Sequence, residues 1–195
     1  MTITNTIQPI KVESLFGAAN AISSLLLTGT PLEVQHAWMI ASERAKGHDH
    51  CRKPQEALGD PAEQQLNESY GALGEVILLN ALFRNGLMPE GYQMVASTAP
   101  VGPDFTLNGI SYQIKSVPPN RRYLCVNEQQ RLNPAHASDF YLPVVFTTPN
   151  ILRVLNPIAS AAVSQWALRY GHSAYRSIDI AKLPGLLSLQ SLSRN

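Results

Sequence analysis

The sequence has little cysteine and no long apolar run. Cys51 and Cys125 are the only two cysteines among 195 residues, too few for a disulfide framework. No apolar segment approaches the roughly 20 residues that a membrane-spanning helix needs, and the first residues lack the pattern of a secretory leader. We therefore expect a protein of the reducing cytoplasm, with no membrane partner.

An excess of charge of either sign is also missing. The formal net charge is +1 at pH 7, whereas nucleic-acid-binding domains are commonly strongly basic. The composition gives no support for a nucleic-acid partner, although a near-neutral protein can still present a basic cleft. The sequence has no internal repeat or low-complexity tract, and its length is that of one ordinary domain with its own core.

The strongest local signal is a β-hairpin within residues 103–115. Asn108-Gly109 is typical of a two-residue turn, and the residues on both sides alternate in character as strands do. Because side chains two apart in a strand share a face, Gln113 and Lys115 should point to one side and the residue between them to the other. The turn would bring Asp104 to this pair, so an acid, an amide and an amine converge on one patch.

This combination of side chains has a chemical interpretation. Mg²⁺ prefers oxygen ligands and usually takes one or two protein carboxylates, while water and substrate phosphate complete its shell. Asp104 can supply a carboxylate, Gln113 an amide oxygen and Ile114 a main-chain carbonyl. Lys115 would lie near a metal-bound water and the scissile phosphate, where its charge helps to make hydroxide and offsets developing charge. Phosphodiester hydrolysis is the natural use of such a site.

Pro103-Asp104 followed by Gln113-x-Lys115 resembles the motif of the PD-(D/E)xK nuclease superfamily, whose members have the restriction-endonuclease-like fold. The family normally has Asp or Glu at the position of Gln113, and a Gln-x-Lys form is familiar from its Mrr-like branch. The resemblance extends over residues 66–180 and implies a metal-dependent nuclease in which Mn²⁺ can replace Mg²⁺.

The family often carries an acidic residue on a helix before the motif, and Glu75 fits that place. We expect this helix over residues 61–85, closed by Gly86, from its apolar spacing. A buried carboxylate needs a partner, which for Glu75 would be the cation shared with Asp104, an arginine, or solvent at the helix edge. Gly71 and Gly74 within this helix indicate that another backbone approaches closely there.

The N-terminal part should be a helical pair. Apolar residues recur at helical spacing from Val12 to Leu27, and Thr30-Pro31-Leu32-Glu33 has the pattern of a cap that opens a second helix to about Lys46. We assign residues 1–60 to this helical segment and residues 61–195 to the nuclease-like domain. The pair could pack on the core, contact DNA or form a dimer interface.

The segment 47–54 contains two histidines and Cys51, which are potential zinc ligands. A closed zinc site normally needs a second ligand pair that the sequence lacks, so a solvated loop is favoured. Lys53 in this loop would help to form a phosphate-facing rim.

The later segments complete an α/β fold with a mixed central sheet flanked by helices. The apolar run from Phe140 to Phe146 is typical of a buried strand with parallel neighbours and helices on both faces of the sheet. We further expect an edge strand at 92–96, a helix resembling the family's later helix at 121–127, a polar helix at 127–132, a strand at 151–155, an amphipathic helix at 158–170 and a last strand at 173–180.

Several polar residues after the motif are candidates for DNA contact. Arg121, Arg122 and Tyr123 could clamp phosphate, since arginine supplies forked donors and tyrosine a stacking surface. An ordinary exposed loop is an equal interpretation. The amides of Asn127, Gln129 and Gln130 could read base edges. His136 could act as a general base, but a lone loop histidine is more often a surface residue.

Taken together, these patterns predict a Mg²⁺-dependent DNA endonuclease of restriction type that hydrolyses duplex DNA. Its catalytic residues would be Asp104, Gln113, Lys115 and Glu75, and a two-fold homodimer would match a palindromic site. The alternative is a noncatalytic nuclease-fold domain that binds nucleic acid or protein, which Gln113 and the low net charge favour. A third reading is an unrelated α/β enzyme in which the hairpin is structural.

Overall fold

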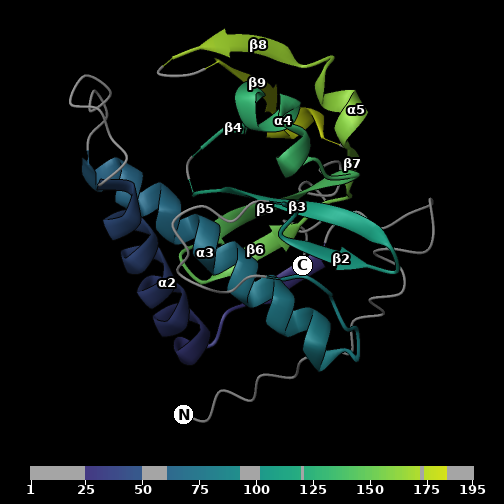
Figure 1. Cartoon of the computed structure of the whole chain (residues 1–195). Helices are drawn as coiled ribbons and strands as arrows, with labels where there is room; N and C mark the ends of the chain where they lie inside the picture. The colour runs from purple at the N-terminus through teal and green to yellow at the C-terminus, as the bar shows by residue number, and fades with distance from the viewer. Residues whose placement is uncertain (1–24, 50–60, 93–101, 120, 172–173, 184–195) are drawn as a thin grey trace, which may run out of the picture.

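A six-stranded mixed sheet and two long helices form the larger part of the protein (Figure 1). The structure is a computed structural model, and it describes residues 25–49, 61–92, 102–119, 121–171 and 174–183. The helices are α2 (Pro31–Asp49), α3 (Pro61–Arg84), α4 (Glu128–Leu132) and α5 (Ser160–Val163). The strands are β1 (Leu25–Thr28), β2 (Phe105–Leu107), β3 (Ile110–Val117), β4 (Tyr123–Asn127), β5 (Phe140–Thr148), β6 (Ile151–Val154), β7 (Ile158–Ala159), β8 (Ala167–Tyr170) and β9 (Ala174–Asp179).

The larger sheet has the strand order β1-β6-β5-β3-β2, and β7 pairs with β5 beside this path. Only β3 and β5 run parallel, and the other pairs in this sheet are antiparallel. The prediction of a mixed α/β protein is confirmed at this level. The buried strand predicted at 140–146 is also confirmed, because β5 lies between β3 and β6 and is buried along most of its length.

The predicted hairpin is formed by β2 and β3. Asn108 and Gly109 have φ angles of 52° and 75°, so both turn residues lie in the left-handed region that a type I′ turn requires. Phe105 pairs with Tyr112 across the hairpin, and their rings stack with centroids 5.1 Å apart. The Asn-Gly turn therefore fixes the register that places Asp104 beside the middle of β3.

The predicted cap starts α2. The Thr30 amide donates to Glu33 Oε2 at 2.7 Å, and the Glu33 amide donates to Thr30 Oγ1 at 3.2 Å, which is a reciprocal capping box. The helix continues to Asp49 and packs along α3. Its buried residues Ala37, Ile40 and Ala41 share one core with α3 and the larger sheet, so residues 25–49 contribute directly to the main layers.

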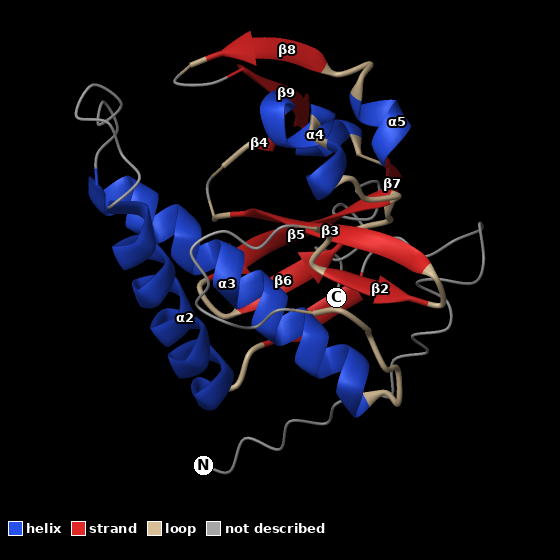
Figure 2. Cartoon of the chain, viewed as in Figure 1, coloured by secondary structure: helices blue, strands red, loops and turns tan. Residues whose placement is uncertain are grey.

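Helix α3 lies across one face of the sheet (Figure 2), and its apolar residues from Val76 to Leu79 are almost completely buried. The predicted span is confirmed, and Gly86 closes the helix with a φ of 76°. The two mid-helix glycines differ. A Cβ on Gly74 would lie 2.3 Å from Ser116 Oγ and 3.4 Å from Val144 Cγ1, whereas a Cβ on Gly71 meets nothing within 4 Å. The predicted approach of another backbone is therefore wrong at Gly71, and at Gly74 the close neighbours are side chains of the sheet.

This difference yields a stability prediction. Gly71→Ala should raise the free energy of unfolding by up to about 1 kcal/mol, because alanine is the better helix former and finds open space. Gly74→Ala should raise the free energy of unfolding by less than Gly71→Ala, or lower it, since the added methyl group displaces the Ser116 side chain. The double variant Gly74→Ala/Ser116→Ala should recover the helix-propensity gain in urea unfolding. Equal effects of the two single alanine variants would contradict the packing seen at Gly74.

The second face of the larger sheet is covered mainly by a smaller sheet and, at Tyr141, by Val163 of the one-turn helix α5. Strands β4, β9 and β8 form this three-stranded antiparallel sheet, drawn above β3 and β5 in Figure 1. Val117 at the end of β3 and Leu155 just after β6 pack in one cluster with Leu124 of β4 and with Leu183. Within the described part of the chain, the expectation of helices on both faces is therefore met on this second face only by the single turn of α5.

Three further element predictions are wrong. Residues 25–28 form strand β1, paired with β6, so they are not the end of an N-terminal helix. Residues 123–127 form strand β4 where the resemblance implied a helix. Residues 158–170 form two short strands with a single helical turn between them. The predictions at 127–132, 151–155 and 173–180 are confirmed within one or two residues, and the edge strand expected at 92–96 lies almost wholly outside the described residues.

Candidate functional site

Asp104 is fixed at the point where β2 begins. Its backbone amide donates to the Tyr112 carbonyl at 2.9 Å, and its side-chain Oδ2 accepts the Ile114 amide at 2.6 Å. Because β2 starts at Phe105, its ladder with β3 ends before Ile114, and the Asp104 carboxylate takes the place of the missing strand. The hairpin thus positions this carboxylate beside the edge of β3, as the sequence predicted.

Ile114 also directs its carbonyl oxygen to this edge. In a β-strand, the amide and carbonyl of one residue point to the same neighbour, and the Ile114 amide points to Asp104. The Ile114 side chain belongs to the main core under α3. Gln113 and Lys115 pair with Tyr141 and Pro143 of β5, so by strand alternation they leave β3 on the opposite face from Ile114.

Lys115 nevertheless lies close to both acids. Burial lowers the pKa of Lys115, while the negative charges of Asp104 and Glu75 act in the opposite direction. Because these charges act on one another in a partly buried setting, the ammonium and the two carboxylates form one electrostatic cluster. The structure therefore brings Asp104, Lys115 and Glu75 within electrostatic range of one another, and Gln113 leaves β3 on the same face as Lys115.

Glu75 is held by an arginine of α2. Arg44 donates from both terminal nitrogens to the two carboxylate oxygens, at 3.0 and 2.6 Å, and both side chains are about one-seventh exposed. This bidentate pair is the arginine partner considered above for Glu75. Arg44 was not identified from the sequence, because partners 31 positions apart leave no periodic signal.

Burial and the neighbouring carboxylate of Glu75 raise the pKa of Asp104. Its pKa rises from 3.8 to about 7, first because of burial and second because of the negative charge of Glu75. The charges of Lys115 and Arg44 and the amide of Ile114 act against this rise without cancelling it. A partly buried carboxylate that repels its neighbour gains from a cation at its free side.

The donor set fits a hard divalent cation with few protein ligands. Asp104 offers a carboxylate, Ile114 a carbonyl and Gln113 an amide, and all are oxygen donors of the kind Mg²⁺ prefers. Both carboxylate oxygens of Glu75 already accept hydrogen bonds from Arg44, so Glu75 is less available than Asp104 as a ligand for a cation. No three His, Cys, Asp or Glu side chains gather into a metal-binding group within the described ranges. Water and substrate phosphate would therefore have to supply much of the coordination.

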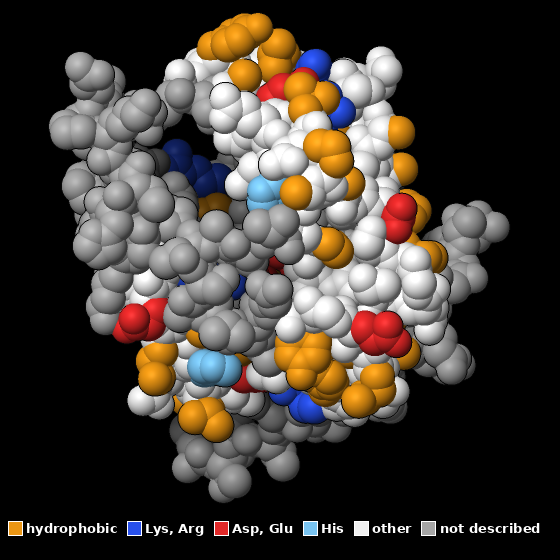
Figure 3. Space-filling view, in the orientation of Figure 1, with side chains coloured by type: hydrophobic (Ala, Val, Ile, Leu, Met, Phe, Trp, Pro, Cys, Tyr) orange, Lys and Arg blue, Asp and Glu red, His pale blue; other side chains and the backbone are white. Residues whose placement is uncertain are grey.

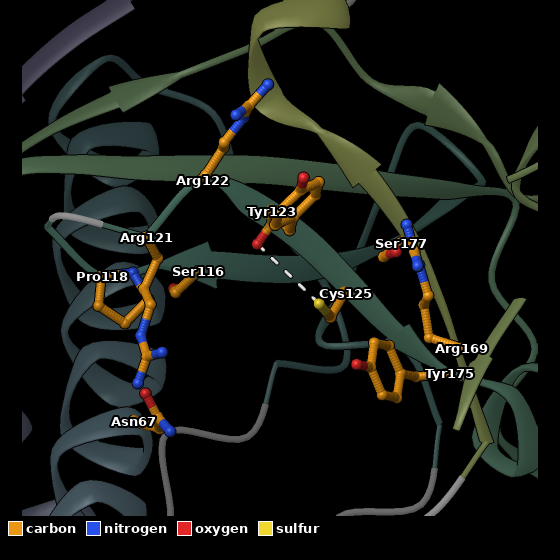
Figure 4. Close-up of a pocket in the computed structure, with 10 residues that line it drawn as sticks. All are labelled: Asn67, Ser116, Pro118, Arg121, Arg122, Tyr123, Cys125, Arg169, Tyr175 and Ser177. Atoms are coloured by element: carbon orange, nitrogen blue, oxygen red, sulfur yellow. Dashed lines mark hydrogen bonds between the residues drawn. The ribbon is translucent and has the colours of Figure 1, made fainter. Parts of the chain in front are cut away.

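The predicted DNA-contact residues separate into two groups. Arg121, Arg122 and Tyr123 line a pocket of about 890 Å³ between α3 and the small sheet (Figure 4). Asn127 instead caps α4, because its side-chain Oδ1 accepts the Gln130 amide at 3.1 Å. The side chain of Gln130 is exposed on α4, as is that of Gln129.

Two other predicted contacts are not part of this group. Lys53 lies outside the described residues. His136 is at the end of the 3-10 helix η2 (Pro134–His136) and is not among the groups that shift the pKa values of Asp104 and Lys115.

The pocket also contains residues that the sequence did not single out. Arg169 of β8 and Tyr175 and Ser177 of β9 line it together with Asn67 of α3. Their signal was hidden because residues 158–170 carry a helix-like apolar spacing, which gave no indication that Arg169 lies beside Tyr175 on paired strands.

In comparisons with protein-family models, curated protein sequences and solved structures, no family, sequence or structure matches this chain. None of the helices within the described residues is both long and apolar enough to cross a membrane. The function has to be argued from the site alone.

Proposed function

We propose that this protein is a Mg²⁺-dependent DNA endonuclease with a restriction-endonuclease-like fold of the PD-(D/E)xK type. The observation that carries the proposal is the Asp104 carboxylate, held by the Ile114 amide at 2.6 Å and sharing one cluster with Lys115 and Glu75. A structural hairpin would not need a second acid and a buried ammonium next to the first acid, because burying charges is costly.

The reaction proposed is addition of water to a phosphodiester phosphorus, with formation of one P–O bond and departure of one sugar oxygen. Bound Mg²⁺ would supply a Lewis acid that polarises the phosphate and lowers the pKa of water. Asp104, the Ile114 carbonyl and Gln113 would hold the cation. Lys115 would orient the attacking water and offset the charge that develops on the phosphate. The attacking water would give up one proton to solvent, and the leaving oxygen would take one proton from solvent.

Arg44 and Glu75 have a positioning role in this scheme. Their bidentate pair fixes a negative charge close to Asp104 without leaving that charge uncompensated. Because Gln113 replaces a carboxylate, the site holds one negative charge less than an Asp or Glu version, and we expect weaker affinity for the ion. Mn²⁺, which accepts the same oxygen ligands, should substitute.

The direct test is cleavage of supercoiled, linear duplex and single-stranded DNA in Mg²⁺, in Mn²⁺ and in EDTA. We expect products in either metal and none in EDTA. Cleavage that persists in EDTA would contradict a metal-dependent reaction. The restriction-type action on duplex DNA, the homodimer and the cytoplasmic location stay predictions, which the substrate panel, sedimentation equilibrium and cell fractionation can measure.

A second candidate is a noncatalytic domain that binds nucleic acid or protein. Gln113 and the Arg44–Glu75 pair favour it, because both reduce the negative charge available to a cation. Calorimetric titration separates the two candidates. Absence of Mg²⁺ and Mn²⁺ binding, together with a DNA affinity that neither ion changes, would favour the noncatalytic domain.

A further inference from the structure

Arg44 is bound to both oxygens of the second acid of the candidate site. Its two terminal nitrogens donate to Glu75 at 3.0 and 2.6 Å, and its Nε is buried without a hydrogen-bond partner within the described residues. The oxygens with which Glu75 could bind a cation are therefore both in contact with a positive charge that belongs to the protein itself.

Arg44 also lies within electrostatic range of other acids. Burial lowers the pKa of Arg44, and the hydrogen bonds and charge of Glu75 raise it. The charges of Asp104 and Glu68 act in the same direction as Glu75, and the pKa ends above its ordinary value. Glu68 precedes Glu75 by two turns of α3, so these two acids lie on the same side of the helix. The guanidinium is therefore a permanent positive charge among three carboxylates, which is the electrostatic setting of a bound cation.

A link between α2 and α3 does not by itself explain this placement. Arg84 of α3 already joins α2 through an ion pair with Glu33, and the Arg84 side chain is 46% exposed. Lys or Arg atoms reach the surface at the end of the two helices where α2 begins and α3 ends (Figure 3). Arg44 and Glu75 are only 14% and 16% exposed, and charges are more costly to bury than to leave in water. Their position near Asp104 therefore indicates a role in the site.

The available oxygens favour one cation over two. In two-metal nucleases, ions about 3.5–4 Å apart stabilise the attacking and the leaving oxygen. Asp104, with the Ile114 carbonyl and the Gln113 amide, can hold one ion. A second ion would need Glu75, whose oxygens are taken, or Glu68, which has an interaction of its own. The described residues therefore offer a ligand set for a single ion.

The charge balance supports the same number. When all groups are ionised, the positive charges of Lys115 and Arg44 stand against those of the three carboxylates, which leaves an excess of one negative charge. One divalent cation already exceeds that charge. A second would be repelled by a cluster that has become positive.

We infer that the candidate site binds one divalent cation, and that the Arg44 guanidinium occupies the place beside Glu75 that a second cation has in two-metal nucleases. The inference rests on the proposed nuclease function and deepens it, because it fixes the number of ions and assigns the place of the second one to a side chain. Arg44 is a positioning residue, since it acts through Glu75.

The number of bound ions tests this inference. The full-length protein is titrated with Mn²⁺ without DNA, and free Mn²⁺ is measured by its electron paramagnetic resonance signal. We expect one ion per wild-type chain. Arg44→Gln should bind a second ion at a Mn²⁺ concentration at least about tenfold below any at which the wild type does, because this variant frees two oxygens and loses one positive charge. Two ions in one site should also show magnetic coupling in the spectrum.

Three variants make the result specific. Arg84→Gln changes the charge by the same amount and breaks an ion pair between the same two helices, so it should keep one ion and an uncoupled spectrum. Arg44→Lys retains a positive charge beside Glu75 and should also keep one ion. Arg44→Gln/Glu75→Gln removes the carboxylate as well and should return to one ion, without leaving an unpaired buried charge.

Several results would overturn the inference. These are two coupled ions or none on the wild type, a single ion on folded Arg44→Gln, and a second ion that remains in the double variant. Circular dichroism melts show whether each variant is folded. The wild-type count decides alone if Arg44→Gln unfolds.

Failure of the nuclease proposal would look different, because the ions are counted without DNA. One ion on the wild type and two on Arg44→Gln, with no cleavage of any DNA in Mg²⁺ or Mn²⁺, would support the place of Arg44 and reject the catalytic assignment. Cleavage by a wild-type protein that carries two coupled ions would support the nuclease proposal and reject the inference about Arg44.

Discussion

Lys115→Ala is expected to reduce Mg²⁺-dependent cleavage by about 10²–10⁴-fold, the range typical of removing a group that assists proton transfer or stabilises charge in the transition state. Lys115 lies close to Asp104 and Glu75, and burial lowers its pKa. Its ammonium therefore lies in a partly buried setting, within electrostatic range of the carboxylate that would hold the cation. Single-turnover cleavage of a labelled oligonucleotide, with enzyme in excess, measures the chemical step apart from product release.

Two variants make this result specific. Lys115→Met keeps the length and apolar stem of the side chain, so its activity should be as low as that of Lys115→Ala even where its thermal stability is normal. His136→Ala should cleave at the wild-type rate, because His136 lies on the 3-10 turn Pro134–His136 outside the cluster. A Lys115→Met protein with full activity would show that the ammonium takes no part in the reaction.

Local sequence signals predicted much of what positions the site. The Asn108-Gly109 turn and the Thr30–Glu33 capping box are decided by neighbouring residues, and both form as expected. They place Asp104 next to Ile114 and start the helix that carries Arg44. These features succeed because turns and caps are set by backbone geometry within a few residues.

The errors occur where distant pairing decides the structure. Residues 25–27 are three leucines in succession, which fits a helix or a strand equally, and pairing with β6 makes residues 25–28 a strand. In residues 158–170 the helix-like spacing serves a buried face only as far as Val163 and Trp166, since all four residues of β8 are exposed. In strand β4, exposed and buried residues alternate from Tyr123 to Val126, which is the period of a strand, but the side chains Tyr-Leu-Cys-Val do not alternate between polar and apolar in the sequence.

The same limit applies to the site. The need of Glu75 for a partner follows from burial, but the identity of Arg44 depends on how α2 packs on α3. The pocket residues Arg169 and Tyr175 come together only through the pairing of β8 with β9. Sequence therefore predicted the chemistry carried by one hairpin and could not predict the side chains that other elements bring to it.

Asp104→Asn should abolish Mg²⁺ binding while the fold is retained, because the amide oxygen of asparagine can still accept the Ile114 amide but carries no charge. In the wild type, the pKa of Asp104 is about 7, so the cation must displace a proton at lower pH, and the Kd for Mg²⁺ should rise about tenfold for each pH unit below 7.

The folding stability of the metal-free protein should change with pH in the opposite direction, being higher at low pH. Because the folded-state pKa lies above the ordinary value of 3.8, the metal-free folded protein holds a proton that the unfolded chain has lost, and its stability should fall as pH rises from 3.8 to about 7. Calorimetric Mg²⁺ titrations and urea unfolding across this pH range measure both effects, and Asp104→Asn should remove both together. Magnesium affinity that stays constant from pH 5 to pH 8, or that survives in Asp104→Asn, would show that this carboxylate does not hold the cation.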